Sequence, residues 1–398
     1  MQQTFKLHKD TEFSERSTVN QDNQRRIHFV VNDSWFFASH RLPIAVAAME
    51  NGNEVHLSAV ADHTSNTIEQ EGVVFHPWSL HPRSRNPLRE IQSFVSLYRS
   101  IKISNPDILH LVTVKSVLYG GIIARMLNVH SVVFAISGRG YIYSTENGST
   151  NLLKRLTNSL YRFALSHRNS TVIVQNTADQ NFFVDNKLAS MNRMRLIPGS
   201  GVDLAKYNEK PSPDKHDLPI ILFASRMLWD KGVDDFVNAA KIINKNSVQA
   251  KFVLAGTADP NNPRSVPLSW LESLPEHEGI KWIGHCDDMA DLIAQSSVVV
   301  LPSRYGEGVP KILIEAAAIG RPIVTTDWPG CNDAVRHEYN GLLSTPGDIK
   351  SLTDNIKILI ENQELRCRFG KNSRTLAEST FSIENVIERT LNIYDELQ

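Results

Sequence analysis

The sequence predicts an α/β protein of two domains, each built on a doubly wound parallel sheet. Three observations support this fold class. A chain of 398 residues is longer than one ordinary compact core. Short apolar runs alternate with segments of helical period, which implies parallel strands joined by crossover helices. The alternation stops at residues 206–219, KYNEKPSPDKHDLP, and then restarts. We therefore expect a linker between two similar units, with the deepest cleft between them.

The first unit contains five runs that are typical of buried strands, at residues 26–31, 54–59, 107–112, 131–136 and 171–175. Between them, apolar residues recur at helical spacing, which predicts helices at 41–52, 88–103, 117–127 and 152–166. Residues 32–40 are expected to form a loop. Gly52 ends the first helix, and Gly120 and Gly121 are small enough for close helix packing.

The second unit repeats the pattern. Strands are expected at residues 220–224, 251–255, 281–283, 297–301 and 322–325, and helices at 233–244, 289–295 and 309–319. The tail from 349 to 398 is helical in period.

Composition restricts where the protein works. Cys286, Cys331 and Cys367 show neither a disulfide framework nor a metal-ligand spacing, so we expect a reducing compartment. The first 26 residues are polar and lack the apolar core of a signal peptide. No apolar run approaches the roughly 20 residues that span a bilayer. We expect a cytoplasmic protein whose contact with the membrane is peripheral.

The formal net charge of −1 hides an uneven distribution. Residues 81–170 carry a net charge of about +9. Such a concentration indicates an anionic partner, either phosphate, a lipid headgroup or nucleic acid, unless it is only a solvated face. The basic residues are Arg83, Arg85, Arg89, Arg99, Lys102, Lys115, Arg125, Arg139, Lys154, Arg155, Arg162 and Arg168.

The most informative segment is residues 301–320, LPSRYGEGVPKILIEAAAIG. A buried strand ends, a glycine-flanked loop turns the chain, and Pro310 opens a helix, where its missing N–H costs nothing. The free amides at that helix start are suited to hold a phosphate or a sugar oxygen. Glu307 and Glu315 could each accept paired hydrogen bonds from vicinal hydroxyls, as in a sugar and a ribose. Alone, the segment is equally compatible with an ordinary strand–loop–helix unit.

A second segment, residues 221–233, reads ILFASRMLWDKGV. Arg226 and Lys231 follow a buried strand, and in a doubly wound sheet ligands bind at the carboxyl ends of the strands. Two positive charges there suit a nucleoside diphosphate leaving group, whose negative charge grows as its bond breaks. The chain has no D-x-D pair. We therefore expect catalysis without a metal or another cofactor.

These motifs resemble those of the family 4 glycosyltransferases, which have the GT-B fold. The resemblance covers most of residues 220–343, through ASRMLWDKGVDDFV, KFVLAG, WIGHCDDMADLIAQSSVVVLPS, EGVPKILIE and RPIVTTDWPGCNDAVRHEYNGLL. In the first half, residues 32–55 resemble the opening of one subgroup, NDxxFFxSHRLPxAxAAxxxGxEV, and DILHLVTVKSVLYGGIIAR follows.

The resemblance implies that each domain binds a different substrate. After a polar tail, residues 1–26, the acceptor-binding domain is residues 27–205 and the donor-binding domain is residues 220–380; a C-terminal helix, residues 381–398, packs back on the first domain. The resemblance assigns Arg226 and Lys231 to the donor diphosphate and Glu307 to the transferred sugar. The remaining donor-binding positions are Gly256, Ile283, His285, Gly308, Val309, Pro310 and Glu315, the last on the ribose hydroxyls. The family retains anomeric configuration through front-face attack, with the leaving phosphate as base.

Two positions depart from the family pattern. Asn32-Asp33-Ser34 stands where many relatives have a glycine-rich loop, and Ser137 lies in the segment where many have a histidine that reaches the donor sugar. We expect Asp33 to cap a helix rather than to act as a base.

Four further residues could contact the acceptor. His40 and Arg41 either face the cleft or form an exposed helix start. His110 is either a cleft residue or a buried strand-end histidine that is hydrogen-bonded to backbone, and Lys115 follows the same strand. The apolar residues of helices 88–103 and 152–166 are expected to be core.

The function that follows is transfer of a hexose or N-acetylhexosamine from a nucleotide sugar, UDP-linked by expectation, to a lipid-diphosphate-linked saccharide in bacterial surface polysaccharide synthesis. The expected partners are that donor, that acceptor and an anionic inner leaflet. Three alternatives remain open: a sugar-nucleotide epimerase, a phosphorylase on the same scaffold, and a non-catalytic binder of nucleotide sugar or nucleic acid. The last lacks the aromatic ladders of RNA-binding modules.

Overall fold

The computed structural model describes residues 24–81, 86–138, 151–213, 218–245, 250–260, 262–306 and 308–398, with no side-chain description for 151–156. Its first sheet has seven parallel strands in the order β3-β2-β1-β4-β5-β6-β7. The strands are β1 (Arg26–Asp33), β2 (Glu54–Val60), β3 (Val74–Pro77), β4 (Ile108–Val112), β5 (Ser131–Ile136), β6 (Ser170–Val174) and β7 (Met194–Leu196).

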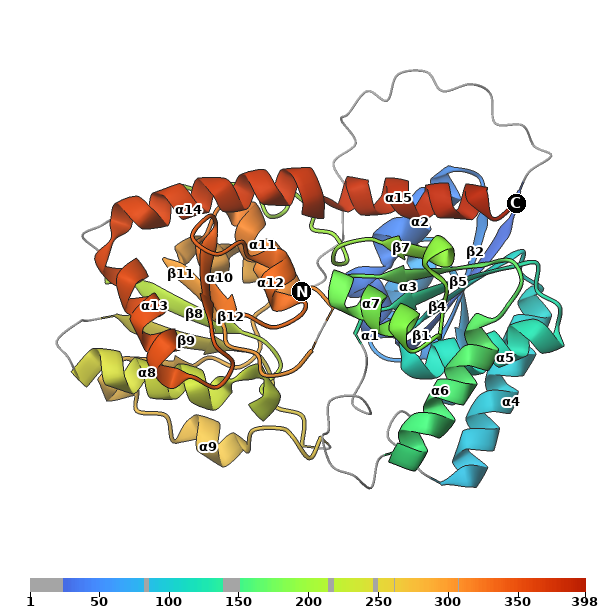
Figure 1. Ribbon diagram of the computed structural model, residues 1–398, viewed down its shortest axis with the longest axis horizontal. Helices are drawn as coiled ribbons and strands as arrows, with labels where there is room; N and C mark the ends of the chain where they lie inside the picture. Colours follow the sequence, from blue (N-terminus) through green and yellow to red (C-terminus); the bar gives the residue numbers. More distant parts are fainter. Residues whose placement is uncertain are drawn as a thin grey trace, which may run out of the picture.

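Helices cover both faces of this sheet (Figure 1). Alternate residues of β1 point to opposite faces, so Phe29 and Val30 belong to different core clusters. The helices are α1 (Ser34–His40), α2 (Leu42–Glu50), α3 (Ser65–Gln70), α4 (Pro87–Ser104), α5 (Val114–Met126), α6 (Asn151–Leu165) and α7 (Thr177–Asp185).

The second sheet has six parallel strands in the order β10-β9-β8-β11-β12-β13. They are β8 (Ile220–Ala224), β9 (Lys251–Ala255), β10 (Ile280–Trp282), β11 (Val298–Leu301), β12 (Ile323–Thr326) and β13 (Gly341–Ser344). Its helices are α8 (Val233–Lys245), α9 (Leu268–Glu272), α10 (Met289–Gln295), α11 (Lys311–Ile319), α12 (Cys331–Ala334), α13 (Ile349–Glu361) and α14 (Gln363–Leu376). The expectation of two doubly wound parallel-sheet domains is confirmed.

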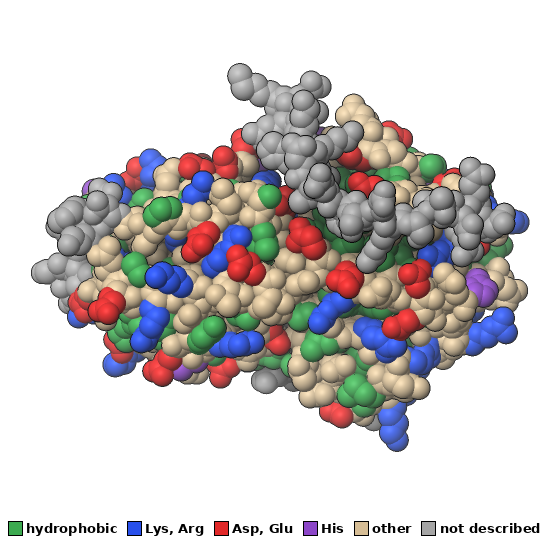
Figure 2. Space-filling model, turned by 90° about the horizontal axis from the view of Figure 1, so that it is seen from above, with side chains coloured by type: hydrophobic (Ala, Val, Ile, Leu, Met, Phe, Trp, Pro, Cys, Tyr) green, Lys and Arg blue, Asp and Glu red, His purple; other side chains and the backbone are tan. Residues whose placement is uncertain are grey.

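The last helix, α15 (Ile383–Glu396), belongs to the first domain. It follows α14 along one side of the molecule and crosses from one domain to the other (Figure 1). Its Val386, Ile393 and Tyr394 are buried in the core that α2 and β1 share. On the face shown in Figure 2, acidic and basic side chains are interspersed. Among the described helices, none is long and apolar enough to cross a bilayer.

The structure corrects the prediction at several elements. Residues 34–40, expected as a loop, form α1. The prediction missed β3, β7 and β13, which are edge strands of three or four residues, too short to show a period of their own. The close packing expected at α5 is confirmed, because a side chain at Gly120 would collide with Leu111 and one at Gly121 with Ala164.

A cluster of three histidines lies on one face of the first sheet. His28, His56 and His76 come from β1, β2 and β3, and their rings stack with centroids 5.2 to 5.8 Å apart. His28 is fully buried, with Nδ1 2.6 Å from Ser104 Oγ and Nε2 2.8 Å from Ser58 Oγ. Burial, then the neighbouring His76 and His56, hold the pKa of His28 well below its ordinary value.

Candidate functional site

The turns that follow β8 and β11 meet at the carboxyl edge of the second sheet. Gly232 has φ of +75°, and a Cβ at this position would collide with the backbone oxygen of Pro302. Only glycine therefore lets the two turns approach so closely. Lys231, the residue before it, is nine-tenths buried at this junction, whereas Arg226 is exposed.

The carboxylates near this turn are engaged elsewhere, which leaves Arg226 without a carboxylate partner among the described residues. Asp230 pairs with Arg264, whereas Asp234 and Asp235 pair with Arg304. Spacing alone gave no signal for these pairs, because Arg264 and Arg304 are far from their partners in the sequence. Arg226 therefore keeps its positive charge without a direct carboxylate contact from these residues.

The start of α11 touches the first domain. Gln175, just after β6, accepts a hydrogen bond from the Val309 amide at 3.1 Å, and a Cβ at Gly308 would collide with the Gln175 side chain. Pro310 occupies the N-cap position. Glu307 lies outside the described residues. A sugar that bound the Val309 amide, as the resemblance implies, would displace Gln175 from it.

Glu315 is 6% exposed and lies inside α11. Lys311 Nζ is 3.8 Å from its carboxylate. Burial raises the pKa of the Tyr207 hydroxyl, and a hydrogen bond to Glu315 raises it further. Lys311 Nζ also donates to the backbone oxygen of Ser39 at 2.7 Å, so this cation links the predicted ribose carboxylate to the first domain.

The positions expected near the base lie at the ends of β9 and β10. Gly256 has φ of +134°, and its amide donates to the backbone oxygen of Gly284 at 2.7 Å. Ile283 is 38% exposed. His285 points to Asp287, with Nε2 3.3 Å from its carboxylate, and is largely exposed. The backbone is therefore ordered here, whereas the His285 side chain stands in solvent.

At the carboxyl edge of the first sheet, Thr113 is a residue that sequence reasoning missed. It has φ of +79°, which residues other than glycine rarely adopt, and such strain is common at functional sites. Its hydroxyl donates to Asn32 Oδ1 at 2.7 Å. Asp33 occupies the N-cap position of α1 but its side chain makes no capping hydrogen bond. Ser137, half-buried after β5, lies on the same edge.

His40 and Arg41 do not form an exposed helix start. Arg41 is 5% exposed, and its Nη1 donates to the backbone oxygen of His40 at 3.0 Å. The His40 ring stacks on Phe36 with centroids 4.2 Å apart. Burial, then the charges of Lys311 and Arg41, hold the pKa of His40 well below its ordinary value.

His110 is buried as one alternative required, but its partner is a side chain rather than backbone. Its Nδ1 is 2.6 Å from the Tyr394 hydroxyl, which α15 supplies. Its ring stacks on Phe29. Burial, then the charge of Arg41, holds the pKa of His110 well below its ordinary value, so the ring is neutral.

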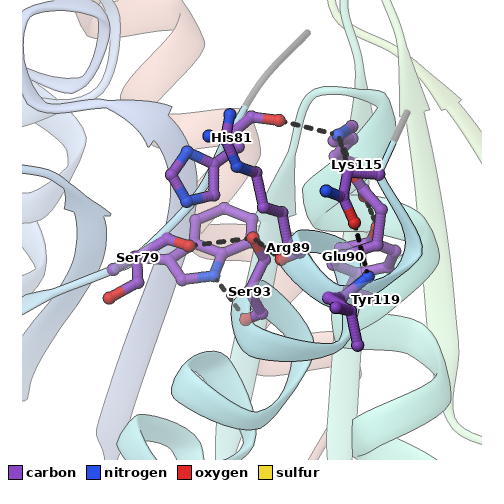
Figure 3. Close-up of polar contacts among 10 residues, drawn as sticks. Ser79, His81, Arg89, Glu90, Ser93, Lys115 and Tyr119 are labelled. Atoms are coloured by element: carbon purple, nitrogen blue, oxygen red, sulfur yellow. Dashed lines mark hydrogen bonds and ion pairs between the residues drawn. The ribbon is translucent and has the colours of Figure 1, made fainter. Parts of the chain in front are cut away.

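Lys115 lies in the first turn of α5, and its side chain reaches Glu90 of α4 (Figure 3). Its Nζ lies 2.9 and 3.0 Å from the two Glu90 oxygens and 3.0 Å from the backbone oxygen of His81. Tyr119 donates to the same carboxylate. Lys115 therefore has a structural ion pair, and the structure does not bring it together with Arg226 or Lys231.

The expectation that the apolar residues of α4 are core is correct for Leu97 and Ile101, which are buried, but wrong for the outer face of this helix. Leu88, Ile91 and Ile103 are exposed by 76%, 60% and 74%. Arg99 and Lys102 lie in the same exposed stripe, since positions 88, 91, 95, 99, 102 and 103 share one helix face. We call these six residues the α4 stripe. Arg83, Arg85 and Arg139 lie outside the described residues, as do the side chains of Lys154 and Arg155.

Two family models match the chain. Residues 206–376 match the model of group 1 glycosyl transferases, and residues 26–176 match that of glycosyl transferase 4-like domains. The two matches correspond to the second and the first sheet.

Among similar proteins is the N,N'-diacetylbacillosaminyl-diphospho-undecaprenol alpha-1,3-N-acetylgalactosaminyltransferase of Campylobacter jejuni, 28% identical over 94% of this chain and 99% of the relative. The UDP-Gal:alpha-D-GlcNAc-diphosphoundecaprenol alpha-1,3-galactosyltransferase of Escherichia coli is 25% identical over 79% of this chain and 82% of the relative. The crystal structure of Anabaena HepE in complex with UDP has the same fold, with a TM-score of 0.74 and 18% identity over 93% of this chain and 100% of that chain.

Proposed function

The chain belongs to the family 4 glycosyltransferases, whose two domains it carries in order, and from this premise we propose a specific reaction. A hexose or N-acetylhexosamine moves from a UDP-linked donor to a lipid-diphosphate-linked saccharide of a bacterial surface polysaccharide, with retention of configuration. Both enzymes named above act, by their names, on undecaprenyl-diphosphate-linked sugars, and one name includes a UDP-linked donor. Their alignments extend over most of this chain, which supports the same substrate classes here.

One observation carries the assignment of the donor site. Arg226 has no carboxylate partner among the described residues and stands with the buried Lys231 where the turns after β8 and β11 meet. The diphosphate leaving group gains charge as the bond from its oxygen to the sugar C1 breaks. Two cations in that turn would stabilise this charge without a metal ion.

The proposed step balances without a covalent enzyme intermediate. The acceptor hydroxyl oxygen forms a bond to C1 on the face that the leaving group vacates, and its proton passes to the departing phosphate oxygen. UDP leaves. Glu307 contacts the sugar, Glu315 holds the ribose hydroxyls beside Tyr207, and the amides at Gly308 and Val309 face the sugar once Gln175 withdraws.

A donor panel tests this proposal. The full chain is incubated with UDP- and GDP-linked hexoses and N-acetylhexosamines and with a short-chain lipid-diphosphate sugar, and nucleotide release, product mass and anomeric configuration are measured. We expect acceptor-dependent release from one UDP-sugar, an α-linked product from an α-linked donor, and the same rate in excess chelator. An inverted product, or activity that magnesium or manganese must restore, would contradict the mechanism. Acceptor-independent conversion of the nucleotide sugar would favour an epimerase.

Peripheral membrane contact is the second part of the proposal. The α4 stripe presents exposed apolar side chains on the same helix face as Arg99 and Lys102, and this combination suits the interface of an anionic leaflet. The stripe lies on the first domain, which is the proposed acceptor domain, so it would hold that domain at the surface where a lipid-linked acceptor resides.

A further inference from the structure

A small cavity lies in the first domain between the sheet and α15. It is lined by residues of β4, β5, β6, α15 and the turn after β7, including His110, Ile136, Gly199 and Thr390, and by Arg41 before α2. The enclosed space holds about one water-sized group. The cavity lies next to the second domain. Gln175, which also lines it, accepts a hydrogen bond from the Val309 amide, and Gly199 lies against the Val309 side chain.

Two polar atoms of the lining residues are buried without a hydrogen-bond partner among the described residues. They are Arg41 Nε and His110 Nε2. The Tyr394 hydroxyl lies 2.6 Å from His110 Nδ1. Burial raises the pKa of Tyr394, so it keeps its proton and can donate to Nδ1. In the tautomer whose Nδ1 accepts this hydrogen bond, the imidazole proton resides on Nε2, and His110 presents an N–H donor in the cavity that Arg41 also lines.

Comparison with other buried arginines shows what Arg41 lacks. Arg366 is equally buried and its Nε also lacks a partner, yet its Nη1 donates to two backbone oxygens, at 2.6 and 2.8 Å. Arg321 donates to several backbone oxygens. Arg41 donates only to His40, and no carboxylate pairs with it in the described chain. Although burial lowers the pKa of Arg41 to about 10, it remains charged at neutral pH. A buried cation with so little compensation is costly.

We propose that this cavity is an anion site, in which Arg41 and the His110 Nε2–H hold one phosphate oxygen of a substrate diphosphate. The oxygen enters from the domain interface when Gln175 releases Val309. The inference rests on the proposed function in one respect, namely that two diphosphates, donor and acceptor, meet at this interface. Because Arg41 belongs to the first domain, the acceptor diphosphate is the expected occupant.

Calorimetry on the full chain tests the site with inorganic pyrophosphate as the probe. UDP is added first to saturation, so that it occupies the donor site, and pyrophosphate is then titrated. We expect wild type to bind pyrophosphate beside UDP and Arg41→Met to bind it at least tenfold more weakly, the usual effect of losing a charged hydrogen-bond donor. Arg41→Lys should be intermediate. The matched control Arg366→Met, which removes an equally buried arginine away from the cavity, should bind as wild type.

The outcomes separate the two sources of phosphate. If Arg41→Met weakens UDP itself and no pyrophosphate binds beside UDP, the site serves the donor diphosphate. If both Arg41 variants bind UDP and pyrophosphate like wild type, the anion site is refuted. If wild type does not bind UDP, the donor assignment fails, but pyrophosphate titration of the unliganded chain still decides the role of Arg41. Should Arg41→Met not fold, Arg41→Lys and His110→Phe provide the same comparison.

Discussion

At the scale of single residues, Arg226 offers a clean test because its exposed side chain contributes little to the fold. Arg226→Ala should lower kcat about a hundredfold or more, as does the loss of one electrostatic stabiliser in other enzymes, while Tm stays unchanged. Lys231→Ala should lower kcat similarly but should also lower Tm, because Lys231 is buried. Lys251→Ala, which removes an exposed cation at the start of β9, is the control. Near-normal turnover in both site variants would refute the donor assignment.

The two glutamates should separate binding from chemistry. Glu315→Gln should weaken UDP binding by about tenfold with a smaller effect on kcat, because a ribose contact persists through the reaction. Tyr207→Phe removes the hydroxyl that donates a hydrogen bond to Glu315, so it should reproduce part of the loss of UDP affinity. Glu307→Gln should mainly lower kcat. Calorimetry with UDP beside steady-state kinetics would show the reverse pattern if the two roles are exchanged.

At the scale of elements, the α4 stripe should bind anionic membranes. Each basic residue near such a surface contributes roughly 1 kcal/mol and the contribution is screened by salt, whereas the apolar contribution is not screened. In vesicle sedimentation, Arg99→Glu with Lys102→Glu should reduce binding to anionic vesicles by at least tenfold. Leu88→Ser with Ile91→Ser should weaken binding at all salt concentrations. Donor hydrolysis should persist in both. Equal binding to neutral and anionic vesicles would contradict the electrostatic part of this account.

The cluster of His28, His56 and His76 predicts how stability depends on pH. His28 is neutral in the fold, since its pKa is lowered, whereas in the unfolded chain it binds a proton below its ordinary value of 6.5. Its contribution is therefore fully present above pH 6.5 and is lost as pH falls, by about 1.4 kcal/mol per pH unit. Thermal unfolding between pH 8 and 5 should show this loss, and His28→Gln should make the slope less steep by the contribution of this one histidine. His277→Gln, an exposed histidine, should not alter the slope. An unchanged slope in His28→Gln would show that other groups dominate.

Sequence pattern predicted the central strands because each is an apolar run with its own period, as in residues 108–112 and 298–301. It missed edge strands such as β3 and β13, whose pairing depends on a longer neighbour. It also placed Lys115 at the site. The sequence shows that Lys115 follows a strand, but it does not show that Glu90 on another helix pairs with it. The contact of Gln175 with Val309 and the strained Thr113 depend on tertiary geometry, which no local pattern encodes.

For the whole molecule, the position of α15 makes the first domain depend on the last residues of the chain. Deletion of residues 382–398 removes Val386, Ile393, Tyr394 and Leu397 from its core. At about 1.5–3 kcal/mol for each apolar side chain, the loss is comparable with the stability of a whole domain. Scanning calorimetry should show the first-domain transition lost or strongly lowered while the second persists. Deletion of Gln398 alone, which is exposed, should change neither transition. An intact first-domain transition after the longer deletion would contradict this.

The chain passes between the domains twice, and the two passages touch. Val202 donates its amide to the backbone oxygen of Phe381, and its own oxygen accepts the amide of Ile383 at 3.0 Å. A Cβ at Gly201 would collide with Ile383. The two connections between the domains are hydrogen-bonded to each other at this point, so they would act as a single hinge. Such a hinge allows the domains to rotate but opposes sliding of one domain past the other. Opening and closing would therefore be a rotation that breaks or forms the contact between Gln175 and Val309. The angle between the domains would then govern both substrate entry and the alignment of the two diphosphates.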